Sequence, residues 1–423
     1  MPTTHTWQGD AVAVAQESRA TPANVGTADV FTLTCGGVSV SYTAESGDGV
    51  AEVTAGLTTA WNASTAPQLT EVTATDKTTY VELLCDAAGV EFTATGSTTD
   101  GDGSDDQTLT ISTATAVAGP SVWAAANFDS ATLPVTGDTV VLEDSDVDIL
   151  YGLDQSSVTL AVLRIRQSYT GTVGLPRTAA ASAHVSGTSA YVEYRDTYLR
   201  ISATSLEIGE GDGSGSGRLK IDVGANQTTA NIHNSGAPAE QNHAPIIWKG
   251  TNASNAMSVT KGDIEVAPFA GETATLATLR VGYKSNRTDD SEVSLGSGAT
   301  LTTIEQSGGK LHIRSNLTTL RQTAGAASIY EAATLTTLNL YGGTCYYQSS
   351  GTLTTANVAG ILDFRRDMRA RTVTNCELYG GAAIHDPHKT VTWTNGVDCH
   401  LCSPTEATLN IGTHLRLTVG AVA

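Results

Sequence analysis

The chain has 423 residues, of which 16% are charged and 5% are aromatic, and its formal net charge is −20. This acidic balance argues against a nucleic-acid-binding protein, which needs a basic surface, and against adsorption to anionic lipid. No apolar run reaches the roughly 18 residues of a membrane span, and no basic segment followed by an apolar stretch marks a signal peptide. We therefore expect no membrane insertion, and synthesis in the cytoplasm without export by the usual signal.

Residues 1–118 predict a small α+β module. In residues 30–44, apolar and polar side chains alternate on both sides of Gly36-Gly37, which predicts a β-hairpin. Residues 80–95 alternate in the same way around the sequence DAAG and predict a second hairpin. Between the two, apolar residues at helical spacing predict a helix with Asp48 as its candidate N-cap; they are Val50, Val53, Leu57, Ala60 and Trp61.

Cys35 and Cys85 each lie where a predicted hairpin strand meets its turn. If the hairpins pack side by side, the two thiols come close together. Two small buried apolar residues and a disulfide are both compatible with this pattern. A disulfide would have to form outside the reducing cytoplasm.

Residues 95–110 lose their apolar side chains, and we expect a long loop there. Asp100, Asp102, Ser104 and Asp106 alternate in it like the ligands of a calcium loop, because hard cations need several oxygens on one short segment. The glycine and glutamate that an EF-hand has at its sixth and twelfth positions are absent. Asp100, Asp102 and Asp106 therefore form a candidate calcium site, with a solvated acidic loop as the alternative.

From residue 119 to the end, short apolar runs alternate with Gly, Asn, Asp and Thr, and no amphipathic helix is evident. The tetrapeptide Leu-Thr-Thr-(Ile/Leu/Ala) begins at Leu301, Leu317, Leu335 and Leu353, at spacings of 16, 18 and 18 residues. This period predicts solenoid coils in which Leu stacks on Leu inside, Thr lies outside and Gly-Gly forms a corner.

We therefore expect a mainly β protein. Its body, residues 119–423, would be a right-handed parallel β-helix (solenoid) with a C-terminal cap from about residue 395, preceded by the small α+β N-terminal domain. The glycine-rich residues 209–217 lack the Lys-Ser/Thr of a phosphate-binding loop and predict an exposed turn.

Histidines and cysteines gather near the C-terminus, where their spacing suggests a zinc site. A strand over residues 397–402 would point the two cysteines to opposite faces, so packed cysteines and surface histidines are the alternative. The residues are His385, His388, Cys399, His400 and Cys402.

Carboxylates on the later coils are candidates for a polysaccharide-cleaving pair; they are Asp363, Asp367, Glu377 and Asp386. The segment 362–375 also concentrates arginines beside two of them. Such a cluster could bind an acidic sugar, form a salt-bridged face of the coil or make a contact between subunits. No arrangement of serine, histidine and aspartate suggests a catalytic triad, so we assign no catalytic residue.

Two stretches carry a resemblance to phage and prophage virion proteins. Residues 29–64 (DVFTLTCGGVSVSYTAESGDGVAEVTAGLTTAWNAS) resemble a hairpin-helix module of such proteins. Residues 121–138 (SVWAAANFDSATLPVTGD) are similar to the segment that opens many phage and bacterial β-solenoids, with Phe128 in place of the usual second Trp. The resemblance implies a structural virion component and brings no catalytic motif with it.

We expect a non-enzymatic structural protein of a phage or phage-like particle: a tail fibre, a decoration protein or another tail component. Its N-terminal domain would anchor it to other virion proteins, and its β-helix would project as a rigid rod that self-associates as a homotrimer. The alternatives are a tailspike-like polysaccharide depolymerase and an adhesin that binds host-surface glycan, with or without calcium as its only cofactor.

Overall fold

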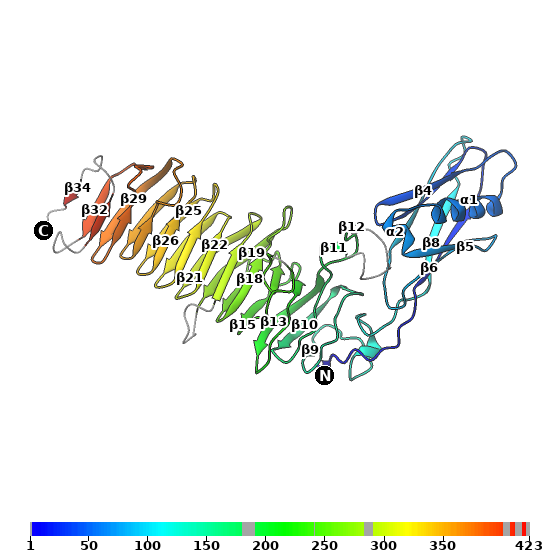
Figure 1. Cartoon of the computed structure of the whole chain (residues 1–423), viewed down its shortest axis with the longest axis horizontal. Coiled ribbons are helices and arrows are strands. Elements are labelled where there is room, and N and C mark those ends of the chain that lie inside the picture. Colours follow the sequence, from blue (N-terminus) through cyan, green and yellow to red (C-terminus); the bar gives the residue numbers. More distant parts are fainter. Residues whose placement is uncertain are drawn as a thin grey trace.

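The computed structural model of the chain describes residues 2–179, 191–240, 242–282, 291–400, 407–410 and 417–419. Strands make up 48% of the chain and helices 5%, so the protein is mainly β, as expected. Figure 1 shows a long stack of short strands that runs from β9 to β34, with a group of strands and helices beside its N-terminal end. We call the stack the rod and residues 14–118 the N-terminal region.

The N-terminal region contains two antiparallel sheets and the long helix α1. One sheet has the order β5-β6-β2-β8 (Val72–Asp76, Val81–Cys85, Glu17–Ala23 and Thr108–Thr115). The other has the order β4-β3-β7 (Val38–Thr43, Val30–Cys35 and Ala94–Thr99). Helix α1 (Val50–Asn62) packs its buried side chains into a core that both sheets share, and the short helix α2 (Pro67–Thr70) follows it.

The first predicted hairpin and the predicted helix are confirmed. Strands β3 and β4 pair around Gly36 and Gly37, which have φ angles of 59° and 79°. The prediction of Asp48 as the N-cap is wrong, because Gly49 holds that position. The Asp48 carboxylate instead accepts hydrogen bonds from the Tyr42 hydroxyl and the Glu45 amide, both at 2.7 Å.

The second predicted hairpin is wrong. Strand β6 pairs with β5 and β2, and the next strand, β7, pairs with β3. Between them, the Gln16 side chain donates to the carbonyl of Phe92 at 2.8 Å and accepts from its amide at 3.1 Å. A glutamine therefore satisfies the backbone that a hairpin partner would have paired. Because β7 reaches Thr99, the predicted loop from residue 95 shrinks to residues 100–107.

The first residues of the chain belong to the rod, although the sequence suggested that they lie in the first module. Strand β1 (Thr4–Thr6) pairs in parallel with β9 (Thr139–Leu142). Trp7 stacks on Trp123 at 6.2 Å between ring centroids and meets the edge of Phe128 at 5.5 Å. The N-terminal region is thus inserted between the two parts of the first coil.

Two parallel ladders form the rod. The first joins β1, β9, β10 (Asp154–Arg166), β13 (Leu199–Glu210), β15 (Thr229–Ile232), β17 (Ala256–Val259), β19 (Ala274–Val281), β21 (Ala299–Gln306), β23 (Leu317–Gln322), β25 (Leu335–Leu340), β27 (Leu353–Val358), β29 (Arg371–Tyr379), β32 (Val397–His400) and β34 (Leu417–Val419).

The second ladder joins β14 (Leu219–Asp222), β16 (Ile246–Lys249), β18 (Gly262–Val266), β20 (Ser291–Leu295), β22 (Lys310–Ile313), β24 (Ala326–Ile329), β26 (Thr344–Tyr347), β28 (Ile361–Asp363), β30 (Ala383–His385) and β33 (Thr408–Asn410). Outside the two ladders, β31 (Val391–Trp393) pairs with β29, and β11 (Thr178–Ala179) pairs with β12 (Tyr191–Val192). The ladders continue beyond residue 395, where the sequence suggested a cap.

From residue 119 onward, the 3₁₀ turn η1 (Ala125–Asn127) is the one helical element among the described residues. No helix in the described part of the chain has both the length and the hydrophobicity to cross a membrane. The body of the protein is therefore solenoid-like.

The recurring tetrapeptide has the predicted role. Leu301, Leu317, Leu335 and Leu353 lie in register in successive coils, and each is at most 4% exposed. The threonines of the motif lie on the outer side, either exposed or partly exposed. Each leucine therefore packs on an equivalent leucine one coil along, which keeps apolar surface out of water along the rod.

The predicted Gly-Gly corners are found at Gly308-Gly309 and Gly342-Gly343, and the single Gly325 makes the corner between them. Gly309, Gly325 and Gly343 have φ angles of 68°, 80° and 75°, a region that side chains other than glycine rarely adopt. Two buried glutamines stabilise these corners, and the sequence did not indicate them. The Nε2 of Gln306 donates to carbonyls on both its own coil and the next, and Gln322 repeats the arrangement one coil later.

Candidate functional site

Two of the three residues of the predicted calcium site lie together. Carboxylate oxygens of Asp100, Asp102 and Asp29 all lie within 4.8 Å of one another, whereas Asp106 is not part of this group. Asp29 is fully buried just before β3, and it accepts hydrogen bonds from the amides of Gly26 at 2.7 Å and Gly101 at 2.9 Å. The cluster therefore unites two segments that are distant in the sequence.

The loop is folded around its own carboxylates. The Asp100 carboxylate accepts the amides of Asp102 and Gly103 at 3.0 and 2.8 Å, and the Asp102 carboxylate accepts the amide of Ser104 at 2.8 Å. The side chains of Asp100 and Asp102 remain exposed. Two carboxylates of this loop and that of Asp29 therefore converge as oxygen ligands of the kind that calcium prefers.

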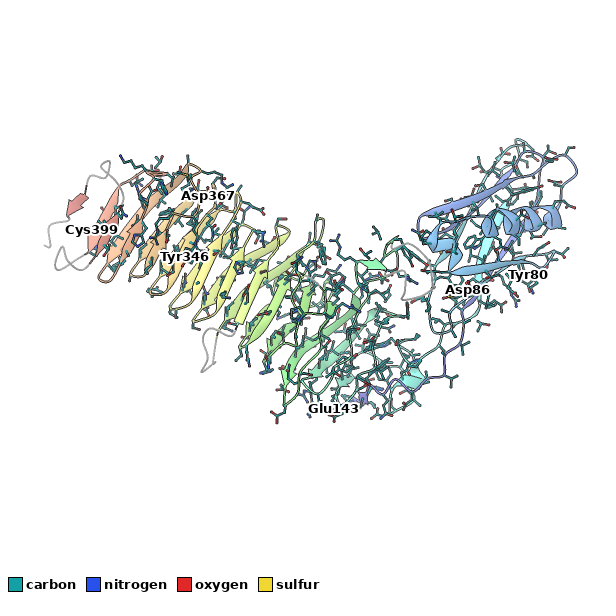
Figure 2. The ribbon with its side chains drawn as sticks, viewed as in Figure 1. Tyr80, Asp86, Glu143, Tyr346, Asp367 and Cys399 are labelled. Carbon is teal, nitrogen blue, oxygen red and sulfur yellow. The ribbon has the colours of Figure 1, made fainter. Side chains whose placement is uncertain are left out.

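Among the described residues, the candidate zinc ligands near the C-terminus form no cluster of three that could hold an ion. His385 lies in β30 of the second ladder, whereas Cys399 and His400 lie in β32 of the first. Cys402 lies outside the described residues. Figure 2 shows Cys399 near the C-terminal end of the rod. Burial raises the pKa of the Cys399 thiol, whereas a zinc ligand must be a thiolate.

Nearby protein groups engage each of the candidate catalytic carboxylates on the later coils. Both oxygens of Asp363 accept hydrogen bonds from the Arg365 guanidinium, at 2.6 to 3.1 Å. Asp367, on the edge of the rod in Figure 2, is held in the same way by Arg369. The arginine-rich segment is thus salt-bridged to its own aspartates.

The other two candidates are also engaged. Asp386 is 1% exposed and accepts hydrogen bonds from the amides of Thr390 and Val391 at 2.8 and 3.1 Å. The Tyr379 hydroxyl donates to Glu377 at 2.6 Å. These contacts give each carboxylate a structural role, so no catalytic function is needed to account for it.

The pKa values of Asp363 and Asp367 also argue against a catalytic role. Burial opposes the ionisation of Asp363, but the hydrogen bonds from Arg365 outweigh it and lower its pKa. Hydrogen bonds from Arg369 lower the pKa of Asp367. A general acid that cleaves a glycosidic bond needs a raised pKa, so neither residue suits that role.

A buried ionic network joins the N-terminal region to residues 191–195, which lead from β12 into β13 of the rod, and the sequence did not indicate it. Arg195, on the segment after β12, donates to Glu193 from Nε at 2.7 Å and contacts Glu71 of the N-terminal region at 3.4 Å. The Tyr191 hydroxyl also donates to Glu71. All four side chains are buried. We call Glu71, Tyr191, Glu193 and Arg195 the junction network.

The junction network carries two carboxylates and one guanidinium. Burial raises the pKa of Glu71, which shows how costly its charge is in this environment. Arg195 also donates to the backbone carbonyl of Glu91 at 3.1 Å, a further contact with the N-terminal region. Charges of this kind stay buried only while their partners are in place, so the network holds the two parts of the chain in one arrangement.

The cysteines beside this junction are buried thiols. Cys35 and Cys85 belong to one apolar core and are both free. Burial raises the pKa of Cys35 to about 11. Its Sγ donates to the Tyr194 hydroxyl at 3.5 Å. A thiol of this kind packs as a small apolar group and is a poor nucleophile.

Comparisons with known proteins find no family model, no curated protein and no solved structure that matches this chain. Its function must therefore be inferred from the fold and the side chains themselves.

We expect calcium to stabilise the acidic loop. At a concentration about 100-fold above the dissociation constant, a bound ion stabilises the folded chain by about 2.7 kcal/mol, and thermal unfolding with and without a chelator measures this. Asp102→Asn should abolish the increase in melting temperature. Asp106→Asn is the matched control and should retain it. Equal melting temperatures of the original chain with calcium and with chelator would exclude the site.

We expect the junction network to be essential for the arrangement of the chain. Arg195→Met leaves the Glu71 and Glu193 carboxylates buried without their partner and should cost about 3–5 kcal/mol of unfolding free energy. Denaturant unfolding measures this loss, and hydrogen exchange locates it. Arg200→Met removes an exposed pair with Asp154 at 3.1 Å and should cost at most about 1 kcal/mol. Equal losses in the two variants would contradict the assignment.

Proposed function

We propose that the chain is a non-enzymatic structural protein that holds two points of a larger assembly at a fixed distance. The rod would be a right-handed parallel β-helix, the hand that crossover connections between parallel strands strongly prefer. The N-terminal region would be a small α+β domain that anchors it. Unbroken strand pairing from β1 to β34 supports this proposal most directly.

The expected setting is a phage or phage-like particle, in which the chain would be a fibre, decoration or tail component. The sequence resemblance of residues 29–64 and 121–138 motivates this setting. The partners would be other virion proteins, contacted by the N-terminal region, and further copies of the same chain. A homotrimer is the expected form, because three parallel rods can cover one another's faces.

The junction network supports an anchoring role. A rod transmits position only if its base is fixed to the anchor. Arg195 supplies this fixation with contacts to Glu71 and to the carbonyl of Glu91. A depolymerase is less well supported, because all four candidate carboxylates are engaged by arginine, tyrosine or backbone donors.

Electron microscopy of the full-length chain, alone and in particles from its native source, tests the proposal. We expect a rod of stacked coils in a trimer, with residues 14–118 in contact with the particle. A monomer that is absent from particles would contradict it.

A second candidate function, glycan binding, rests on the outer face of the later coils. Tyr341 and Tyr379 are 61% and 39% exposed, and Ala359 holds the equivalent position in the coil between them. The outward residues two positions earlier in these coils are Asn339, Asn357 and Glu377. Exposed aromatic faces beside amides and a carboxylate can stack on sugar rings and bond their hydroxyls. Tyr379 stacks one of its faces on His400, at 5.1 Å between ring centroids, which leaves only its other face for a sugar.

Glycan binding predicts that Tyr341→Ala and Tyr379→Ala each weaken binding about 2- to 10-fold, because one aromatic contact is worth about 0.5–1.5 kcal/mol. A glycan array on the full-length chain, followed by titration of any sugar that binds, measures the effect. Met368→Ala, which removes a 71% exposed apolar side chain, is the control and should bind normally. Absence of binding to every sugar would contradict this function.

A further inference from the structure

Two carboxylates and one imidazole meet on the outer face of the first coils of the rod. Oxygens of Glu207 and Glu210 and a ring nitrogen of His233 all lie within 4.8 Å of one another. The His233 Nε2 is 3.1 Å from Glu207 Oε2 and 3.6 Å from Glu210 Oε1. All three side chains are partly exposed, so an ion can reach them from solvent.

A bulge in β13 places both carboxylates on one face. Residues three apart in a regular strand point to opposite faces. Here Ile165 pairs with Ile208, but the next residue, Arg166, pairs with Glu210, so Gly209 is an extra residue. Gly209 has a φ of 86°. Bulges of this kind change the direction of a side chain, and this one brings Glu210 beside Glu207.

Gly209 is also required by its surroundings. A Cβ at this position would lie 2.1 Å from the carbonyl oxygen of Asn234 in the next coil. The sequence therefore keeps an irregularity inside the ladder, and its visible consequence is the convergence of three side chains that can ligate a metal.

In each carboxylate, one oxygen contacts a neighbouring side chain, by hydrogen bonds in Glu207 and by an ion pair in Glu210, while the other faces the imidazole. Glu207 Oε1 accepts hydrogen bonds from Ser205 Oγ at 2.6 Å and Asn231 Nδ2 at 2.8 Å. Glu210 Oε2 is 3.4 Å from Arg164 Nε. Outer partners that orient the ligands in this way are typical of metal sites.

We propose that Glu207, Glu210 and His233 bind one divalent transition-metal ion of the zinc type. Ligands at about 2.0–2.1 Å from a tetrahedral zinc ion lie about 3.3 Å from one another. The two distances from His233 Nε2, 3.1 and 3.6 Å, lie on either side of that value. Imidazole with carboxylates suits zinc, whereas calcium and magnesium prefer oxygen alone.

The ion would link consecutive coils. Glu207 and Glu210 lie on β13, and His233 follows β15, the next strand of the same ladder. Two carboxylates balance the charge of the ion, and a water molecule takes the fourth position.

The rival arrangement is a protonated His233 paired with both carboxylates, which needs no metal. This inference does not depend on the proposed function, because a rod with another role would bind the ion equally well.

Isothermal titration of the chelator-treated full-length chain with zinc chloride tests the proposal. We expect saturable binding that includes one equivalent at this site, and an increase in the melting temperature. His233→Ala and Glu210→Gln should each remove that equivalent or weaken it at least tenfold. The Glu210 side chain is 42% exposed, so its replacement by glutamine should leave the fold intact, which thermal unfolding without metal checks.

A matched histidine provides the control. His312 Nε2 lies 3.2 Å from Glu292, and its other ring nitrogen bonds the Tyr330 hydroxyl at 3.0 Å, so it has one carboxylate instead of two. His312→Ala should bind zinc as the original chain does. Absence of zinc binding, or the same stoichiometry and affinity in His233→Ala as in the original chain, would overturn the proposal. Equal competition by calcium would overturn the choice of ion.

Discussion

The in-register pairing of each strand with its equivalent one coil away is the constraint on which the rest of the structure depends. It places residues with the same position in the repeat directly above one another, as with Leu317, Leu335 and Leu353. A position that is inside in one coil is therefore inside in the next, so its side chain must be apolar or, like Gln306 and Gln322, hydrogen-bonded there. The end of such a ladder leaves unpaired backbone groups, and β1 covers β9 at the N-terminal end.

At the corners the backbone leaves the ladder, so its buried polar groups lose their ladder partners and need others. Positive φ angles at Gly325 and Gly343 make the turn, and the buried Gln306 and Gln322 donate to the carbonyls that the turn exposes. The junction network pairs buried groups by means of charges. Arg195 donates to Glu193 in its own segment and to the carbonyl of Glu91 in the N-terminal region. In each solution, buried donors are paired with acceptors, which makes the arrangement specific.

The repeat could be read from the sequence because it is local: a short motif returns at a fixed spacing, and spacing alone determines what stacks on what. The predictions that failed concern contacts between residues that are far apart in the sequence. The hairpin at residues 80–95 is absent because Gln16, more than 70 residues away, pairs the backbone of Phe92. Asp29 takes the place of Asp106 in the acidic cluster because a turn before β3 brings it there. Neither contact leaves a trace in the local pattern of apolar and polar residues.

On the outer face, the register also determines which side chains can act together. Arg280, Glu305 and Arg321 occupy one column, and the glutamate contacts both arginines, at 2.9 and 3.5 Å. Such exposed pairs add little stability and follow simply from the repeat. The bulge at Gly209 is different, because it interrupts the column that regular pairing would produce. In a solenoid, stacking accounts for the side chains at regular positions. A departure from the repeat is therefore where a function is to be looked for. The bulge at Gly209, which interrupts regular pairing and brings ligating side chains together, is what supports the metal site that we propose.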